Sequence, residues 1–309
     1  MANEFLTLLD LTKLKGTDTT LGIVEEVTTY APELDTIRGR EITGLSNLVA
    51  VRTALNTKGA FRNANEGSEV GRSMAQQKRF DTFYFDAQMQ VDESLVRASQ
   101  AQGGNAAGIL NAEAVSVMRA KTIAMGSQLY SGSDGKGYPA LSSFLSSTLD
   151  VDAGGSGTTY TAWFVWNAPG GLEFIFSDGG ITEGQWQKQQ VVDPSDSTKR
   201  LMAYVNNLSG YIGVQCPVSY GVGRVKNISA AKPLTDDLAE DLLSYFPVGV
   251  RPTHCFVNRQ TRRYLQKSRS VTVMANVGSR SGSGSFQGTA PLPTDVAGIP
   301  IVVTDSITS

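Results

Sequence analysis

The sequence offers few side chains whose type and spacing are typical of catalysis. Its single histidine, His254, is followed directly by one of two cysteines, Cys255. A cysteine nucleophile needs a base within hydrogen-bond reach, and adjacent residues of a strand point to opposite faces. The apolar run around this pair predicts a buried strand, so we expect a structural histidine and an inert thiol, and the same of Cys216. One histidine also argues against a zinc site.

Motifs for cofactors and paired carboxylates are equally weak. Gly221-Val-Gly223 lacks the third glycine and the following helix of a dinucleotide-binding loop, and the sequence has no phosphate-binding Gly-Lys-Ser/Thr. Asp236-Asp237 and Glu240-Asp241 are interpreted as acids at a predicted helix start, where they are favourable, and as a solvated helix face, so paired catalytic carboxylates are not expected. We therefore predict no catalytic residue, no cofactor, no metal and no enzymatic activity.

Basic residues gather in one segment, which comprises Arg259, Arg262, Arg263, Lys267 and Arg269. The simplest interpretation is a solvated helix face, whose exposed ion pairs contribute about 0–1 kcal/mol each. The whole chain has a net charge of −2, which gives no general attraction to nucleic acid or to an anionic membrane.

Composition indicates a chain with a sizeable core and a surface poor in charge. Only 18% of the 309 residues are charged, against about a quarter in typical soluble proteins. Such a surface fits a protein covered by partners, although secreted monomers fit as well. No charged-then-apolar leader and no apolar run of about 18 residues is visible, which predicts a cytosolic product without a membrane anchor.

The elements that position these residues begin with a polar excursion over 45–85. A strand-like run at 48–55 leads to a turn-rich tip at 56–79 and returns through 80–85. An extended hairpin of this length reaches roughly 60 Å, whereas a compact chain of this size has a radius of gyration of about 19 Å. Because an isolated two-stranded ribbon is only marginally stable, we favour an arm on a neighbouring molecule over a folded-back surface loop.

Two helices are predicted after this excursion, over 91–102 and 105–131, separated by Gly103-Gly104. The second carries a stripe at steps of three and four, which we interpret as a core stripe. The stripe consists of Val115, Met118, Thr122, Met125 and Leu129. A short helix is expected within 138–149.

The β signal that follows predicts a hairpin of 160–166 and 172–176 around a Pro-Gly turn. Strands at 200–205, 210–215 and 223–228 would complete an antiparallel sheet under the long helix. The last third predicts a helix over 235–246 capped by Thr235, a strand at 254–257 and a helix over 259–267 capped by Asn258. A Ser/Gly-rich loop at 268–290 and a closing strand at 299–304 follow.

This order of elements resembles the major capsid proteins of tailed bacteriophages, which have the Hong Kong 97-like shell fold. Four local strings resemble the same proteins: Ala60-Phe-Arg-Asn-Ala-Asn-Glu-Gly67, Trp163-Phe-Val-Trp166 before Phe174-Ile-Phe176, Phe256-Val-Asn-Arg259 with Arg263-Tyr-Leu265, and Gly298-Ile-Pro-Ile-Val302. One departure is that no long N-terminal scaffolding-like segment is visible. Scaffolding would then be a separate protein, a removed segment or missing altogether.

The resemblance implies an α+β fold with five parts. These are an N-terminal arm (1–44), an extended β-hairpin loop (45–90), a peripheral domain with spine helix and antiparallel sheet (91–230), an axial domain (231–298) and a closing strand (299–309). It further implies pentamers and hexamers in an icosahedral shell around phage double-stranded DNA, assembled in the host cytoplasm. Portal protein, packaged DNA and possible scaffolding or decoration proteins are the implied partners.

In this interpretation the 45–85 arm lies over the adjacent subunit, and the basic cluster either faces DNA loosely or pairs with a neighbour's acidic edge, which we favour. The predicted intersubunit contacts are Lys58, Arg62, Glu66, Glu69, Arg72, Arg79, Asp236, Asp237, Arg259, Arg262 and Arg263. Some members of the family cross-link through Lys–Asn isopeptide bonds. Lys58 and Lys78 lie on the arm, but no positioned acid can be located, so non-covalent contacts are preferred.

An alternative is a β-rich virion module that binds carbohydrate or another surface. Its candidate binding residues are aromatic: Tyr138, Tyr160, Trp163 and Trp166.

Overall fold

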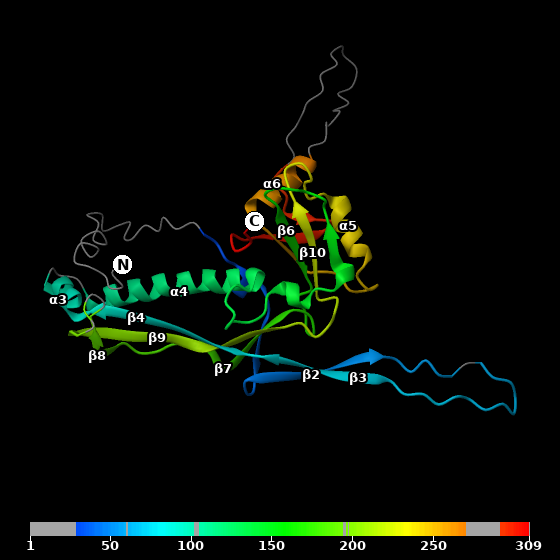
Figure 1. The fold of residues 1–309 in the computed structure, drawn as a ribbon, viewed down its shortest axis with the longest axis horizontal. Helices are drawn as coiled ribbons and strands as arrows, with labels where there is room; N and C mark the ends of the chain where they lie inside the picture. The colour runs from blue at the N-terminus through cyan, green and yellow to red at the C-terminus, as the bar shows by residue number, and fades with distance from the viewer. Residues whose placement is uncertain are drawn as a thin grey trace, which may run out of the picture.

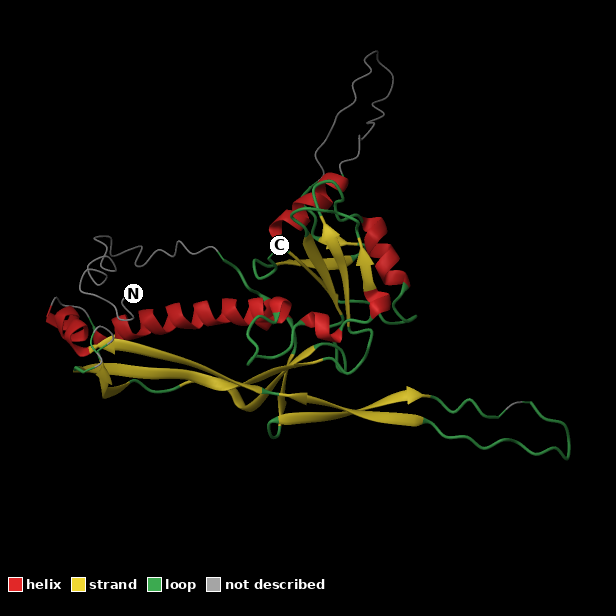
Figure 2. Ribbon diagram, viewed as in Figure 1, coloured by secondary structure: helices red, strands yellow, loops and turns green. Residues whose placement is uncertain are grey.

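The computed structural model describes residues 29–59, 61–101, 105–193, 196, 198–269 and 291–308. Most of the predicted N-terminal arm and nearly all of the predicted 268–290 loop lie outside these residues. A long helix lies along one sheet, an α+β unit stands over one end of that helix, and a hairpin projects beyond the body (Figures 1 and 2).

The long helix α4 (Ala106–Ser131) covers a five-stranded sheet. The sheet consists of β1 (Gly39–Ile42), β7 (Glu173–Glu183), β9 (Arg200–Gln215) and β4 (Phe83–Asp92), in that order, with β8 (Gln187–Val192) paired to the far end of β9. All pairs are antiparallel except β1 with β7. The two strands predicted at 200–205 and 210–215 are therefore one strand. Asn206 lies inside it, where its side-chain amide donates to Glu183 Oε1 at 2.8 Å.

One helix precedes the predicted Gly-Gly break and another follows it. α3 (Glu93–Ala101) begins two residues later than predicted, because Val91 and Asp92 still pair with β9. Asn105 caps α4, accepting the amide of Ala107 at 3.1 Å, and Gly132 ends it in the left-handed region at φ +59°. Both ends of α4 are therefore set by local residues, as expected.

The predicted core stripe of α4 is wrong in its first half. Met125 and Leu129 are buried, but 59% of Val115 and 41% of Met118 are exposed. In the first half Leu110 and Ala114 face the sheet instead. A stripe at steps of three and four drifts around a straight helix of 3.6 residues per turn. α4 also changes its partner along its length, so one stripe does not serve both halves.

The projecting hairpin consists of β2 (Ser46–Ala54) and β3 (Met74–Asp81), paired from Ser46–Asp81 to Ala54–Met74. It confirms the predicted extended hairpin, with one change. The return strand lies at Met74–Asp81 and not at 80–85. Phe83–Phe85 belongs to β4 in the five-stranded sheet. Beyond the last pair, the described residues of 55–73 form no regular strand or helix.

The α+β unit contains a six-stranded sheet in the order β12-β13-β11-β6-β10-β5. Its strands are β12 (Asp295–Val296), β13 (Ile299–Val303), β11 (His254–Val257), β6 (Tyr160–Val165), β10 (Val222–Ile228) and β5 (Asp150–Asp152). α5 (Asp236–Ser244) and α6 (Arg259–Ser268) pack on one face. Thr235 and Asn258 cap these helices as predicted, accepting amide protons at 3.2 and 2.7 Å.

The predicted hairpin of 160–166 with 172–176 is wrong, because β6 and β7 lie in different sheets. β6 pairs with β10 and β11, and β10 is likewise absent from the sheet under α4. Both faces of β6 are buried: Phe164 packs with the helix side of its sheet, and Trp163 packs on the opposite side. A strand buried on both faces belongs in the middle of a covered sheet.

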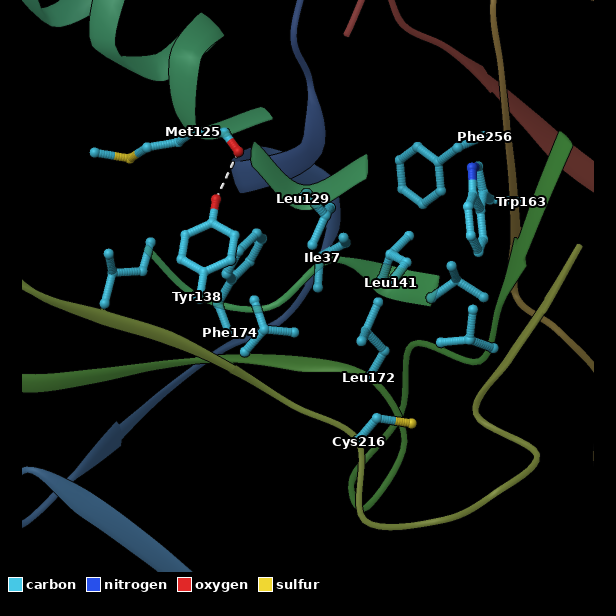
Figure 3. Packing of buried hydrophobic residues seen from close by; sticks show 14 of the residues in the cluster. Ile37, Met125, Leu129, Tyr138, Leu141, Trp163, Leu172, Phe174, Cys216 and Phe256 are labelled. Atoms are coloured by element: carbon cyan, nitrogen blue, oxygen red, sulfur yellow. Dashed lines mark hydrogen bonds between the residues drawn. The ribbon is translucent and has the colours of Figure 1, made fainter. Parts of the chain in front are cut away.

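One core cluster joins the two sheets beneath the second half of α4 (Figure 3). Leu129 and Met125 of α4 meet Phe174 of β7 and Phe256 of β11 there, and the hydroxyl of Tyr138 donates to the carbonyl of Met125 at 2.6 Å. The predicted helix within 138–149 is instead two 3-10 turns, η1 (Leu141–Phe144) and η2 (Ser147–Leu149). None of the helices in the described residues has the length and apolar character to cross a membrane.

Candidate intersubunit surfaces

Of the residues with catalytic potential, the two cysteines are buried and His254 is half-buried. Cys255 is fully buried, and burial raises the pKa of its thiol. Burial also raises the pKa of Cys216 to about 12. His254 Nδ1 lies 3.0 Å from the hydroxyl of Thr253, and desolvation lowers the pKa of its imidazole. The expectation of two buried cysteines is confirmed. In the described part of the chain no three His, Cys, Asp or Glu side chains cluster to hold a metal.

The hairpin tip combines internal ion pairing with fully exposed apolar groups. The ammonium of Lys58 pairs with Glu69 at 2.5 Å, while the Arg62 guanidinium donates to the carbonyl of Glu66. These predicted contact residues thus brace the tip itself. By contrast, Phe61 and Val70 are 108% and 94% exposed. The projecting tip therefore leaves two large apolar side chains in water.

Two further predicted residues lie on β3 or just before it. Arg72 is exposed, and Arg79 pairs with Asp81 at 2.7 Å on the same strand. Lys78 points inward instead: its ammonium donates to the carbonyl of Pro217 at 2.6 Å. Lys78 is therefore an anchor of the hairpin within its own subunit.

The root of the hairpin is held by a polar chain that the sequence did not reveal. The amide of Asn47 donates to Gln215 Oε1 at 2.7 Å, and the amide of Gln215 donates to the buried Glu173 at 2.7 Å. Arg38 completes the chain, with Nε 3.4 Å from Glu173 Oε1. Together with Lys78 these contacts fix the hairpin to the five-stranded sheet. Each residue looks like an ordinary polar strand residue in the sequence.

Three of the five predicted contacts on α5 and α6 are bound within the chain. Asp236 accepts two hydrogen bonds from Arg269, at 2.7 and 2.5 Å, and this partner lowers the pKa of the Asp236 carboxyl. Arg259 pairs with Asp305 at 2.6 Å. Arg262 donates to the carbonyl of Pro293 at 2.8 Å. Asp237 and Arg263 remain exposed on the outer faces of their helices.

A buried carboxyl group, also missed in the sequence, closes the body around α4. Glu33 of α2 (Glu33–Thr36) is 0% exposed and accepts the hydroxyl proton of Thr304. Its second oxygen is buried together with the hydroxyls of Tyr130 and Ser306, which lie against it. Burial raises the pKa of Glu33. Gly126 of α4 allows the Glu33 carboxyl to lie against the helix, because a Cβ at this position would lie 2.6 Å from the carboxyl oxygen.

The aromatic residues of the alternative interpretation do not form an exposed binding face. Trp163 and Tyr138 are 4% and 3% exposed and belong to the core. Trp166 lies against Tyr220 with ring centroids 5.7 Å apart, and Tyr160 is half-buried. A carbohydrate-binding module therefore gains no support from these side chains.

Comparison with known proteins places the fold. No protein-family model matches the chain. No curated protein is detectably similar to it in sequence. Solved structures do match. A chain in a structure of bacteriophage Epsilon15 is 15% identical, with a TM-score of 0.68, and the match covers 100% of this chain and 97% of that one.

The capsid of bacteriophage JBD30 also matches, with 13% identity, a TM-score of 0.52 and coverage of 97% of this chain and 99% of that one. The JBD30 capsid decorated with minor capsid protein trimers gives 12% identity, a TM-score of 0.53 and coverage of 97% and 98%. The class that these matches define is the Hong Kong 97-like fold of phage capsid chains. The predicted fold is thereby confirmed.

Proposed function

We propose that this chain is the major capsid protein of a tailed bacteriophage, a structural subunit and not an enzyme. Its copies would form pentamers and hexamers in an icosahedral shell around double-stranded DNA. The observation that carries the proposal is the projecting hairpin with its exposed Phe61, on a fold shared with phage capsid chains. The subunit leaves apolar tip residues in water because they are covered only after assembly.

The hairpin would lie over the spine helix and sheet of an adjacent copy. The outer side of α4 suits this role, because Val115 and Met118 are exposed there. Burying one large apolar side chain contributes about 1.5–3 kcal/mol. A few such contacts per subunit, repeated over a closed shell, would stabilise it without making the free subunit insoluble.

The proposed division of the chain keeps the sequence-based parts 1–44, 45–90, 91–230, 231–298 and 299–309, with additions from the structure. The unit that would surround five- and six-fold axes also takes β5, β6 and β10, because they complete its sheet. Residues 39–42 belong to the body as β1. Portal protein, packaged DNA and any scaffolding or decoration proteins remain predicted partners, and the location in the virion follows from the same proposal.

Shortening the hairpin tests this function. Replacing 55–73 by an Asn-Gly turn joins Ala54 to Met74, the last paired residues, with a connection typical of two-residue hairpins. We expect a folded chain with an unchanged thermal midpoint that forms no shells by sedimentation and negative-stain imaging. Phe61→Ser in the full-length tip serves as the matched point variant.

Limited proteolysis gives a second measure that does not depend on shell closure. The tip should be cut readily in free subunits and protected in assembled ones. Normal shells from the shortened chain would refute the proposal. So would a full-length chain that stays strictly monomeric while its residues 45–85 resist proteolysis.

A further inference from the structure

The α+β unit carries an acidic face on α5. Its exposed side chains Asp237, Glu240 and Asp241 lie on one side of the helix without a basic residue among them. The face continues into apolar groups, since Tyr245 is 59% and Val248 107% exposed. A groove of about 650 Å³ runs beside them, lined in part by Glu240 and Val248 and, at its other end along the chain, by Arg251.

A basic face lies on α6. Arg259, Arg263 and Lys267 are exposed and follow one another at steps of four, so they form one stripe along the helix. An apolar group accompanies this stripe as well. Leu292 is 52% exposed, and its segment is tied to α6 by the hydrogen bond from Arg262 to the carbonyl of Pro293.

The dipole of each helix accounts for only part of these charges. Asp237 in the first turn of α5 and Lys267 in the last turn of α6 suit it, and Arg259 at the start of α6 already pairs with Asp305. Asp241 lies in the last turn of α5, where an anion is disfavoured by about 0.3–1 kcal/mol. Within the described residues, Glu240, Asp241 and Arg263 have no ionic partner. A partner outside the subunit would offset this cost.

The two faces are held at fixed positions on different flanks of the unit. α5 packs on β10 and β5 at one edge of the sheet, whereas α6 packs on β6 and lies apart from α5 in Figure 1. The double hydrogen bond between Asp236 and Arg269 ties the start of α5 to the end of α6. Surfaces that differ yet complement each other on two flanks produce a head-to-tail contact, which forms rings where the rotation between copies closes and filaments where it does not.

We propose that the acidic face of α5 on one copy binds the basic face of α6 on the next copy, with the exposed Leu292 seated at the groove beside Val248. This inference rests on the proposed shell function and names the surface that joins subunits within each ring. Exposed charge pairs contribute little stability singly, so their main effects are to select the partner surface and to speed encounter. The contact is therefore weakened by salt.

Cysteine pairing tests the contact directly, because both native cysteines are buried. One full-length chain carries Glu240→Cys and a second carries Arg263→Cys. After mild oxidation of the mixture we expect a disulfide-linked pair that contains one of each chain. Either variant alone should give no linked dimer. A dimer of Glu240→Cys chains alone, or no linked pair from a mixture that still forms shells, would overturn the inference.

Charge reversal separates this contact from the shell function. Glu240→Lys with Asp241→Lys should abolish ring formation, as should Arg263→Glu with Lys267→Glu, and the four changes together should restore it. Lys136→Glu, an exposed loop change outside both faces, is the control and should assemble normally. Shells from either double variant would refute the α5–α6 contact and leave the proposed function standing. Free subunits from the wild-type chain, with no linked pair in the mixture, would count against both.

Discussion

Glu33 provides the sharpest prediction for the subunit body. Replacing it by Gln keeps the size of the side chain and an oxygen that accepts the hydroxyl proton of Thr304. The change removes the carboxyl group, whose pKa burial raises, from a residue that is 0% exposed. We expect Glu33→Gln to unfold like the wild type at low pH and to be the more stable chain at pH 8.

The sign follows from the direction in which burial moves the Glu33 pKa. The pKa is raised in the folded chain above its ordinary value of 4.5. The protonated group therefore contributes its full stability below pH 4.5, and this contribution falls as the pH rises through the folded pKa. The loss amounts to about 1.4 kcal/mol for each pH unit between the unfolded and folded pKa values.

Urea unfolding of the two purified chains at pH 4 and pH 8 measures the effect. The free-energy difference between Glu33→Gln and the wild type should shift in favour of Gln as the pH rises. Glu33→Ala is the contrast, because it removes the acceptor of the Thr304 hydroxyl proton and opens a cavity, at a cost of about 2–4 kcal/mol at pH 4 that shrinks toward pH 8 by the same amount as for the Gln variant. Parallel pH profiles for the Gln variant and the wild type would refute the reasoning.

Two further predictions concern the core. Leu129→Ala, at a fully buried position where α4 joins the two sheets, should lower the free energy of unfolding by about 2–5 kcal/mol in urea titrations, and a loss below about 1 kcal/mol would contradict the described packing. Cys216 and Cys255 should resist thiol reagents in the folded chain, because both are buried with raised pKa values, and should react once the chain is denatured. Rapid labelling of the native chain would show that one of them is accessible.

Features fixed by neighbouring residues could be predicted from the sequence. The caps Thr235 and Asn258 and the bounds of α4 depend on residues a few positions apart, and all appear in the structure. Strand partners could not be predicted in this way. The Pro-Gly turn after β6 resembles a hairpin locally, but the burial of both faces of β6 directs it into a separate sheet.

The candidate surfaces show the same difference between features set by nearby residues and features set by distant ones. Sequence alone identified the charged residues of α5 and α6, because a run of like charge is a local property. It could not separate Asp236, which is bound to Arg269, from Asp237, which is exposed. Glu33 was missed altogether, since nothing near it in the sequence indicates that Thr304 will lie against it.

The contact between Glu33 and Thr304 also constrains when a nascent chain can complete its fold. The two residues are 271 positions apart, and Asp305 additionally donates its amide to the carbonyl of Tyr30 at 2.9 Å. Ribosomes add about 5–20 residues per second, so roughly 14–54 s separate the synthesis of the two partners. During that time the residues of the hairpin have already been synthesised, but the contact between Glu33 and Thr304 has not yet formed. Under the proposed shell function, subunits able to assemble appear only after Thr304 and Asp305 have emerged, which would limit premature association on the polysome.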